Sequence, residues 1–368
     1  MKENKARVIA FYLPQYHPIP ENDKYWGKGF TEWTNVAKPL FRGHYQPHIP
    51  ADLGFYDLRL PEVREAQAEL ARDAGIEGFC YYHYWFGNGK MLLQKPFEEV
   101  LRLGKPDFPF CLCWANHDWT TKTWVKGSSM VNNTMIAQQE YLGEQDDIKH
   151  FEYCLRAFKD HRYITIEGKP IFLIYDPLSF PNVKEFMNRW NFLAKKNNLK
   201  GIYFIGVTTG RQSSYKIVTN LGFDGVCHNR RWEAEAKAAG FRFVRRMQSL
   251  LGWHLGISLM KYDYNKVVRN YDTPENKLEN CYPVITPGFD RTPRAGRRAG
   301  IYVNSSPKNF KKHVAEICKS IQDKDDDHRL VFLSAWNEWG EGNYMEPDLK
   351  WGHGYLEALK SVVKFQIK

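Results

Sequence analysis

Near its C-terminal end the chain reads Leu330-Val-Phe-Leu-Ser-Ala-Trp-Asn-Glu338-Trp-Gly340-Glu341-Gly342, an apolar run that leads into a turn with two carboxylates. Such a run is typical of a buried strand. If the strand continued, Glu338 and Glu341 would point to opposite faces, because side chains alternate along a strand. The two can converge only if the backbone turns, and Gly340 and Gly342 supply the conformational freedom for that turn.

The same strand pattern recurs along the chain, with helical patterns between the strands. Apolar, β-rich runs lie at residues 8–13, 78–85, 110–114, 171–175, 202–207, 224–227, 282–286 and 330–335. Helical spacing of apolar residues lies at 61–74, 148–159, 183–196, 307–322 and 354–365, with Pro61 and Pro307 at first-turn positions. Eight strands that alternate with helices predict an α/β fold, a (β/α)8 barrel. We find no repeat or linker, so residues 1–368 are expected to form one catalytic domain.

Polar and aromatic side chains gather at the ends of these strands, where a (β/α)8 barrel carries its catalytic groups. The connections after the first, third and sixth strands are long, as expected of segments that build a cleft. The candidate substrate-binding residues there are Tyr12, Gln15, Tyr16 and His17 after the first strand, His83, Tyr84 and Trp85 at the end of the second, Trp114, Asn116, Asp118 and Trp119 after the third, and Asn337, Trp339, Tyr344 and Glu346 after the eighth.

Two loops add further candidates. Residues 30–35 could place Glu32, Trp33 and Asn35 over the barrel mouth, or could form a short helical turn capped by Thr31. Residues 286–298 hold one carboxylate among four arginines, including the candidates Asp290 and Arg291. Such a cluster could bind a phosphate or a uronate through bidentate contacts, or could be a solvated loop.

Two carboxyl groups about 5 Å apart cannot both ionise easily, so one pKa should rise while the other stays low. This pattern suits glycoside cleavage, with Glu338 and Glu341 as the catalytic pair. The tryptophans and tyrosines around the turn, including Trp336 and Trp351, support this interpretation, because flat rings suit the C–H faces of sugars. Two solvated glutamates on a surface loop are the alternative.

The net charge of +10 calls for a partner or a solvated surface. A phosphate-bearing, acidic or lipid-linked glycan, or an anionic membrane surface, would fit it. Lysines and arginines that cover helix faces would also explain it. No nucleic-acid-binding motif accompanies the charge. Residues 241–260 mix three arginines with apolar side chains, and predict either a basic amphipathic element on a membrane or a cover helix on the barrel.

The sequence has no secretory signal and no apolar run long enough to span a bilayer, so a cytoplasmic location is expected. Seven scattered cysteines agree with reduced, buried thiols. No metal or other cofactor is expected: Cys111 and Cys113 lack a second pair, and His17 and His83 suit hydrogen bonding better than ligation. The run 325–327 has the Asp-x-Asp spacing of some transferases, but it follows a basic helix and predicts a solvated loop.

Together these motifs resemble those of glycoside hydrolase family 99 and the related WbsX-type proteins, which are regarded as glycosyltransferases of bacterial surface-polysaccharide synthesis. The resemblance covers nearly the whole length and rests on residues 10–17, 29–35, 81–85, 113–116, 287–290 and 337–347. It implies a (β/α)8 barrel and retaining chemistry on α-linked sugars. It also implies that Glu338 is the base that assists the sugar's 2-hydroxyl and that Glu341 is the acid and base. Where relatives have an acidic residue after Trp-Ala-Asn, this chain has His117 followed by Asp118.

Three functions fit the sequence. The first is a retaining, endo-α-mannosidase-like glycosidase that acts on an α-linked glycan in O-antigen or capsule (lipopolysaccharide) metabolism. The second is a WbsX-type glycosyltransferase on the same barrel, with arginines that hold a phosphate leaving group. The third is an inactive glycan-binding barrel. The carboxylate pair and the lack of a nucleotide-binding motif favour the first, whereas the expected cytoplasmic location and the family resemblance suit the second.

Overall fold

The computed structural model describes residues 6–38, 44–121, 134–210, 212–239, 260–296 and 299–363, together with residues 247, 248, 250, 251 and 255. Most of the segment 241–260, whose role the sequence leaves open between membrane contact and barrel cover, lies outside the described residues, as do Arg297 and Arg298. None of the described helices is both long and apolar enough to cross a membrane.

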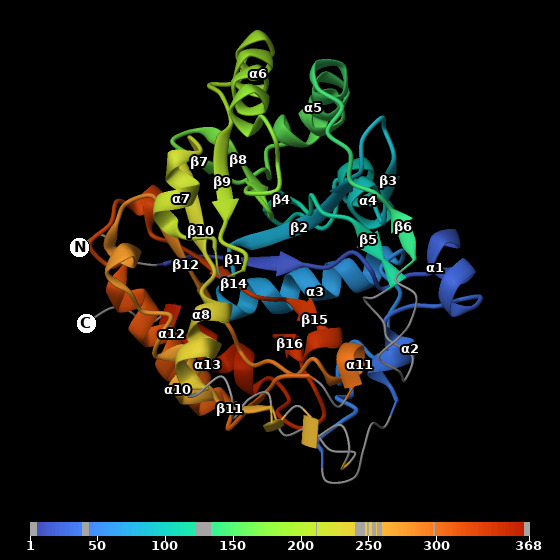
Figure 1. Cartoon of the computed structure of the whole chain (residues 1–368), viewed down its shortest axis with the longest axis vertical. Coiled ribbons are helices and arrows are strands. Elements are labelled where there is room, and N and C mark those ends of the chain that lie inside the picture. The colour runs from blue at the N-terminus through green and yellow to red at the C-terminus, as the bar shows by residue number, and fades with distance from the viewer. Residues whose placement is uncertain are drawn as a thin grey trace.

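Eight parallel strands form a closed barrel at the centre of the molecule (Figure 1). Each lies next to its sequence neighbour, and β1 closes the barrel by pairing with both β2 and β14. This confirms the (β/α)8 prediction, and each expected strand starts within two residues of the observed one. The barrel strands are β1 (Arg7–Tyr12), β2 (Gly78–Trp85), β4 (Phe110–Trp114), β8 (Lys169–Ile174), β9 (Tyr203–Val207), β10 (Gly225–His228), β12 (Cys281–Ile285) and β14 (Leu330–Leu333).

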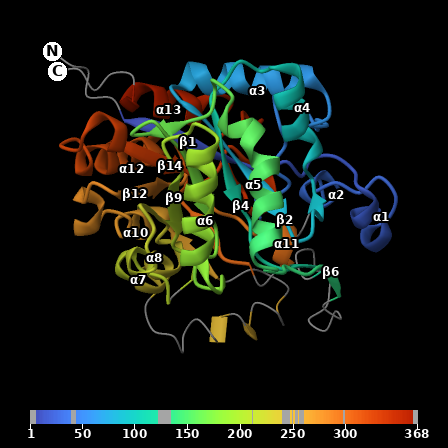
Figure 2. The same cartoon turned by 90° about the horizontal axis from the view of Figure 1, so that it is seen from above.

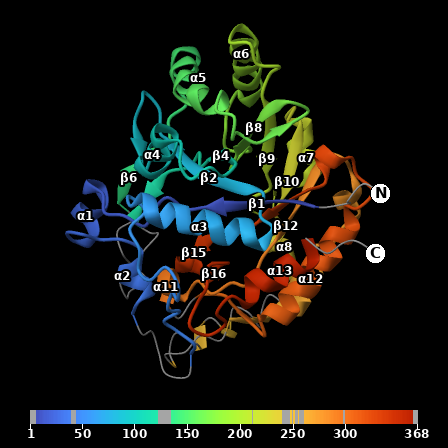
Figure 3. The same cartoon turned by 180° about the vertical axis from the view of Figure 1, so that it is seen from behind.

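Helices surround the barrel, as the three views show (Figures 1, 2 and 3). Figure 3 shows that α3 runs along β1, and that α13 and then α12 follow it around the barrel. Helices α5 and α6 cover another side of the barrel. The described helices are α1 (Pro20–Trp26), α2 (Trp33–Val36), α3 (Pro61–Ala74), α4 (Lys95–Leu103), α5 (Glu144–Phe158), α6 (Val183–Lys196), α7 (Tyr215–Asn220), α8 (Arg231–Ala238), α10 (Tyr264–Val268), α11 (Thr292–Ala295), α12 (Pro307–Ser320) and α13 (Gly354–Val363).

Local signals in the sequence explain where several helices begin and end. Pro61 and Pro307 begin α3 and α12, as expected, because a first-turn proline loses no helical hydrogen bond. Ser306 caps α12 by accepting from the backbone N–H of Asn309. Gly75 ends α3 in the left-handed conformation, with φ 89°.

Short additional strands lie in the loops around the barrel. The expected long connections after the first, third and sixth barrel strands are present. The first carries α1 and α2, the third carries the antiparallel pair β5 (Trp119–Thr120) and β6 (Met135–Ala137), and the sixth carries α8, β11 (Lys261–Asp263) and α10. The additional strands are β3 (Met91–Leu92), β5 (Trp119–Thr120), β6 (Met135–Ala137), β7 (Thr165–Ile166), β11 (Lys261–Asp263), β13 (Ile301–Val303), β15 (Asn337–Glu338) and β16 (Asn343–Tyr344).

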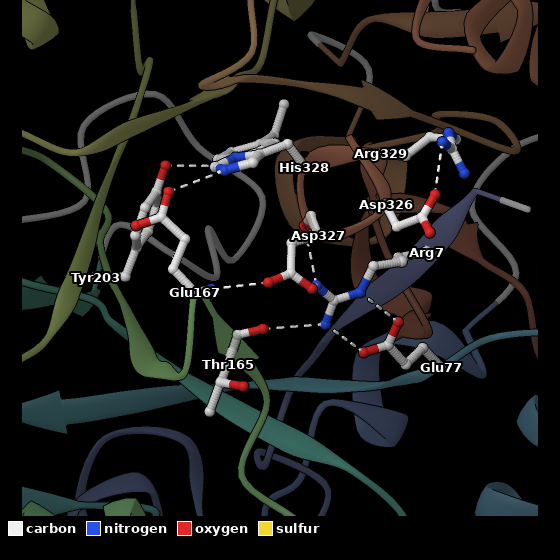
Figure 4. Close-up of polar contacts among 10 residues, drawn as sticks. Arg7, Glu77, Thr165, Glu167, Tyr203, Asp326, Asp327, His328 and Arg329 are labelled. Carbon is white, nitrogen blue, oxygen red and sulfur yellow. Dashed lines mark hydrogen bonds and ion pairs between the residues drawn. The ribbon is translucent and has the colours of Figure 1, made fainter. Parts of the chain in front are cut away.

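A polar network closes the end of the barrel where the strands begin (Figure 4). Arg7 starts β1 and makes a bidentate pair with Glu77, at 2.9 Å from Nε and 2.7 Å from Nη2. Asp327 accepts from the backbone N–H of Glu167 at 2.9 Å, and its carbonyl accepts from Arg7. The run 325–327 therefore helps to close this end of the barrel, in addition to meeting solvent. A functional site is therefore expected at the opposite end of the barrel, where the strands end.

Candidate active site

A cavity of about 230 Å³ opens at the ends of the barrel strands, the place that this fold uses for catalysis. Barrel strands β1, β2, β4, β8, β9, β10 and β14 all end at this cavity, and both Glu338 and Glu341 line it. Its walls are formed by Phe11, Leu13, Gln15, Tyr82, Tyr84, Ala115, His117, Asp118, Trp119, Tyr175, Val207, Thr208, Thr209, Asn229, Arg231, Trp232, Arg294, Ser334, Ala335, Glu338, Glu341 and Asn343.

The two glutamates are carried by a tight turn after β14. Residues Trp339–Glu341 form one 3-10 turn between β15 and β16, which pair in an antiparallel hairpin. Gly342 follows at φ 55°, in the left-handed region that favours glycine. Gly340 has no positive φ, so the turn requires only one of the two expected glycines. The Asn337 side chain fixes the hairpin to β1, because it accepts from the N–H of Leu13 and donates to its carbonyl.

Arginines surround the glutamate pair. Arg294 lies 2.9 Å from Glu338 and 3.1 Å from Glu341. Arg231 and Arg291 approach Glu341 at 3.4 Å and 3.2 Å. The sequence placed Arg291 and Arg294 in one candidate cluster, but Arg231 comes from α8, far away in the chain. Three guanidinium groups therefore converge on Glu341.

This arrangement separates the pKa values of the two carboxyl groups. Burial raises the pKa of Glu338 well above its usual value; Arg294 and Arg291 oppose the rise, and the neighbouring Glu32 and Glu341 carboxylates add to it. Burial would also raise the pKa of Glu341, but the three arginines outweigh it and lower that pKa. Since the pKa values lie on opposite sides of the ordinary value, the expected split is present. Of the two carboxyl groups, Glu338 therefore holds a proton more readily and Glu341 ionises more readily.

Four of the sequence-based substrate candidates line the cavity: Gln15, Tyr84, Asp118 and Trp119. The Gln15 amide donates to the Tyr84 hydroxyl at 2.6 Å, and the Tyr84 ring stacks on Trp119 with centroids 5.7 Å apart. His117, which departs from the family pattern, also lines the cavity. The cavity therefore combines flat rings with hydrogen-bonding groups.

Several candidates at the strand ends lie outside the cavity, because alternation along the strands turns them towards the helices. In β2, Tyr82 and Tyr84 face the cavity, while His83 and Trp85 contact α5 through His150 and Asp146. The candidates whose buried side chains lie outside this cavity are Tyr12, Tyr16, His17, Glu32, Trp33, His83, Trp85, Trp114, Asn116, Asp290, Asn337, Trp339, Tyr344 and Glu346.

Glu346, one of the candidates outside the cavity, is held by hydrogen bonds from three other side chains. Its carboxylate accepts from Trp339 and Gln67 at 2.6 Å each and from Tyr56 at 2.8 Å. Burial raises its pKa to about 7, although these three hydrogen bonds oppose the rise. Tyr12 donates to the same Gln67 at 2.6 Å. Glu346 therefore ties the glutamate hairpin to α3 and the loop before it.

The loop that carries Glu32 also supports the site from outside. Glu32 accepts two hydrogen bonds from Arg294, at 2.8 Å and 3.0 Å, and so fixes the arginine that faces Glu338 and Glu341. Residues 33–36 form the one-turn helix α2, as the alternative interpretation expected, but its N-cap residue is Glu32 and no side chain caps it. Asn35 lies on this turn and contacts Lys38 at 3.1 Å, outside the cavity. Asp290 and Tyr344 line a second cavity behind the hairpin.

Cavity residues that sequence reasoning missed follow the middle strands of the barrel. Tyr175 follows β8, Thr208 follows β9, and Asn229, Arg231 and Trp232 follow β10. The ends of these strands carry no dense aromatic motif, which is why the sequence did not draw attention to them. Counting one residue past every observed strand would have found Tyr175, Thr208 and Asn229, whereas Arg231 and Trp232 lie further along, at the start of α8.

All seven cysteines are buried and free, as expected. Among the described residues, one group could hold a metal ion: His83, His150 and Cys154, whose ligand atoms lie within 4.8 Å of one another. The two Nε2 atoms are 2.8 Å apart, whereas two nitrogens on one tetrahedral zinc should lie roughly 3.3 Å apart. This spacing fits a hydrogen bond between neutral histidines, and burial lowers the pKa of both.

The structure resembles solved glycoside hydrolases in its fold. The endo-alpha-mannosidase of family GH99 from Bacteroides thetaiotaomicron, in complex with bis-tris-propane, superposes over 97% of this chain and 96% of its own, with a TM-score of 0.59 and 16% identity. A glycoside hydrolase-like protein superposes over 98% and 94%, with a TM-score of 0.61 and 16% identity. Identities this low establish a shared fold only.

Sequence comparison identifies closer relatives. Two strains of Xanthomonas campestris pv. campestris contain an uncharacterized protein, WxcX, that is 34% identical over 361 residues, or 97% of this chain. The chain spans about half the length of these curated relatives. The family model Glycosyltransferase WbsX matches residues 8–359. The chain therefore belongs to the WbsX glycosyltransferase family.

Proposed function

We propose that this protein is a carbohydrate-active enzyme of the retaining glycoside-hydrolase type that cleaves an α-linked glycan with Glu338 and Glu341. The observation that carries the proposal is that both carboxyls line one cavity with pKa values displaced in opposite directions. A protonated carboxyl can give a proton to the departing oxygen, while an ionised one takes a proton from the attacking hydroxyl.

The directions of the two pKa shifts also suggest which glutamate does which task. Glu338 is suited to be the proton donor and Glu341 the base, because the arginines hold Glu341 ionised. This is the reverse of the roles that the resemblance to family 99 implies. In either assignment, the sugar's own 2-hydroxyl would attack the anomeric carbon when the base removes its proton, and water would later open the intermediate.

The cavity walls support a sugar as substrate. Tyr84 and Trp119 offer flat rings, and Gln15, Asp118 and Asn229 offer hydrogen-bonding groups beside them. The fold shared with endo-alpha-mannosidases and the family's name both agree with a glycan substrate. We place the reaction in bacterial surface-polysaccharide metabolism, with an oligo- or polysaccharide as the partner.

Glycosyl transfer is the second candidate, and the three arginines are the observation that favours it. A guanidinium binds phosphate oxygens in bidentate fashion. Arg231, Arg291 and Arg294 could therefore release Glu341 and hold the phosphate of a leaving group. The match to the WbsX glycosyltransferase family supports this alternative.

The deciding experiment incubates the wild type, Glu338→Gln and Glu341→Gln with α-linked oligosaccharides, with and without sugar nucleotides, and identifies products by mass spectrometry. Cleavage without a nucleotide that both variants lose would support the hydrolase. Extension that requires a sugar nucleotide would replace it with the transferase. Glu69→Gln, an exposed glutamate on α3, is the matched control and should retain full activity. Binding of glycan without turnover under any condition would leave the third interpretation, a glycan-binding barrel.

A second assay assigns the two roles. An aryl α-glycoside with a nitrophenol leaving group needs no proton donor, so a variant that lacks the acid keeps activity on it, whereas a variant that lacks the base does not. The directions of the two pKa shifts predict that Glu338→Gln keeps activity on this substrate and that Glu341→Gln loses it. The opposite result would restore the roles implied by the resemblance.

A further inference from the structure

A second cavity, of about 280 Å³, lies behind the β15–β16 hairpin and shares no lining residue with the catalytic cavity. Its walls include Tyr45, His48, Gly342, Tyr344, Lys350 and Trp351. The hairpin separates the two, because alternate residues face opposite sides: Glu341 and Asn343 line the catalytic cavity, while Gly342 and Tyr344 line the second cavity. A ligand in the second cavity would thus lie one layer of backbone away from the catalytic glutamate.

Exposed aromatic rings flank the second cavity. Trp351 and Tyr45 are 36% and 43% exposed, far more than the buried aromatic residues of the core. Lys350 lies between them, with Nζ 4.1 Å from the centre of the Tyr45 ring and 5.0 Å from that of Trp351. Flat rings with a polar rim are suited to stacking on the C–H faces of a sugar ring.

The acidic side chains of the second cavity are hydrogen-bonded, whereas its two lysines make no ion pair among the described residues. Asp348 already accepts from the Tyr344 hydroxyl at 2.6 Å and from the backbone N–H of Lys350 and Trp351 at 2.9 Å and 2.6 Å. Asp290 is likewise engaged, with His44 at 2.9 Å and Gln46 at 3.0 Å. The ion pairs found among the described residues include none with Lys350 or Lys261, the two lysines of the cavity.

From these observations we propose that the second cavity is an accessory glycan-binding site that takes an anionic sugar residue, one that bears a carboxylate or a phosphate. The sugar ring would stack on Trp351 and Tyr45, and the lysines would meet its charge. The proposal rests on the proposed function in so far as the ligand is part of the same glycan. An anionic ligand at this site would also account for part of the net charge of +10.

The test measures binding by calorimetry in a Glu338→Gln background, so that turnover does not consume the ligand. Three oligosaccharides of equal length are compared: a neutral one, a uronic-acid-containing one and a phosphate-substituted one. We expect the acidic ligands to bind more tightly than the neutral one. Trp351→Ala and Lys350→Gln should each weaken acidic binding by roughly three- to tenfold. High salt should reduce the advantage of acidic ligands, and it should do so less in Lys350→Gln.

A matched pair on α6 provides the control. Phe192 is 58% exposed and Lys196 Nζ lies 4.6 Å from its ring centre, the same kind of contact outside both cavities. Phe192→Ala and Lys196→Gln should leave binding unchanged. Unchanged acidic binding in Trp351→Ala and Lys350→Gln would refute the accessory site. The wild-type turnover assay reports on the catalytic proposal separately, so each proposal can fail without the other. The uronate and phosphate ligands show which anionic group the site takes.

Discussion

Arg294 lies 2.9 Å from Glu338, measured between Nη2 and Oε1, and both residues line the cavity at the ends of the barrel strands. The same guanidinium contacts Glu32 and Glu341 at 2.8 Å and 3.1 Å. One cation therefore contacts three carboxyl groups, of which Glu32 is buried and the other two are half-buried, and the charge of each of them depends on it. Glu338, Glu341 and Glu32 therefore form a single electrostatic unit with Arg294.

Replacing Arg294 by Met should destabilise the protein by about 3–5 kcal/mol, because buried carboxyl groups would lose their partner. Adding Glu32→Gln in the same chain should recover part of the loss, since one buried charge is then removed as well. Urea unfolding at pH 7 measures both effects. A loss below about 1 kcal/mol for the single variant would show that the three carboxyl groups do not depend on this arginine.

The pH profile of kcat/KM should depend on Arg291. If Glu341 acts as the ionised base, activity falls on the acidic side as Glu341 takes up a proton, below its ordinary pKa. Arg291→Gln removes one of the positive charges that lower this pKa, so the pKa rises and the acidic limb moves to higher pH. Arg102→Gln changes an exposed arginine of α4 that pairs with Glu99, and it should leave the profile in place. An acidic limb that does not move with Arg291→Gln would contradict the assignment.

Gly342→Ala should impair catalysis more than its backbone strain alone explains. A Cβ at this position would lie 2.7 Å from Asp290 Cβ and 3.0 Å from its backbone nitrogen, so the hairpin must shift and carry Glu341 with it. Gly352 has nearly the same φ, 52°, but no atom within 4 Å of its added Cβ. Gly352→Ala should therefore cost only about 1 kcal/mol of stability and leave kcat unchanged. Equal kcat values for the two variants would disprove the close contact.

Stability should decrease between about pH 4.5 and pH 7 because of Glu346. Its pKa rises from 4.5 to about 7 on folding, so the folded state favours the protonated form. The stabilisation from this group is fully present below pH 4.5 and is lost as the pH rises through 7, with a total on the order of 3 kcal/mol. Glu346→Gln should remove this slope from a series of unfolding curves, whereas Glu69→Gln should keep it. An unchanged slope in Glu346→Gln would show that another group is responsible.

The barrel could be predicted from the sequence because each strand is a short apolar run bounded by polar residues. For β2 and β4 the expected limits agree with the observed ones, at 78–85 and 110–114. The start of β8 was missed by two residues, since Lys169 and Pro170 interrupt the apolar pattern but still pair with β7. Where such a strand begins is decided by the strand it pairs with, which a short stretch of sequence does not reveal.

The candidate site was only partly predictable. The glutamate pair was found because both residues follow one strand, within four positions of each other. His83 and Trp85 were assigned to the site although their parity along β2 differs from that of Tyr82 and Tyr84, which line the cavity. Arg231 was missed because it meets Glu341 only through tertiary structure, 110 positions away.

The two hydrogen bonds between the Asn337 side chain and the Leu13 backbone join residues that are 324 positions apart. Because β14 pairs with β1, the glutamate turn reaches its place only when the first and last barrel strands meet. A chain with an open barrel would contain nearly all of its secondary structure and yet lack a competent site. Contacts between such distant residues also form slowly. Catalytic competence should therefore emerge late in folding, and recovery of activity after denaturation should lag behind recovery of helical content.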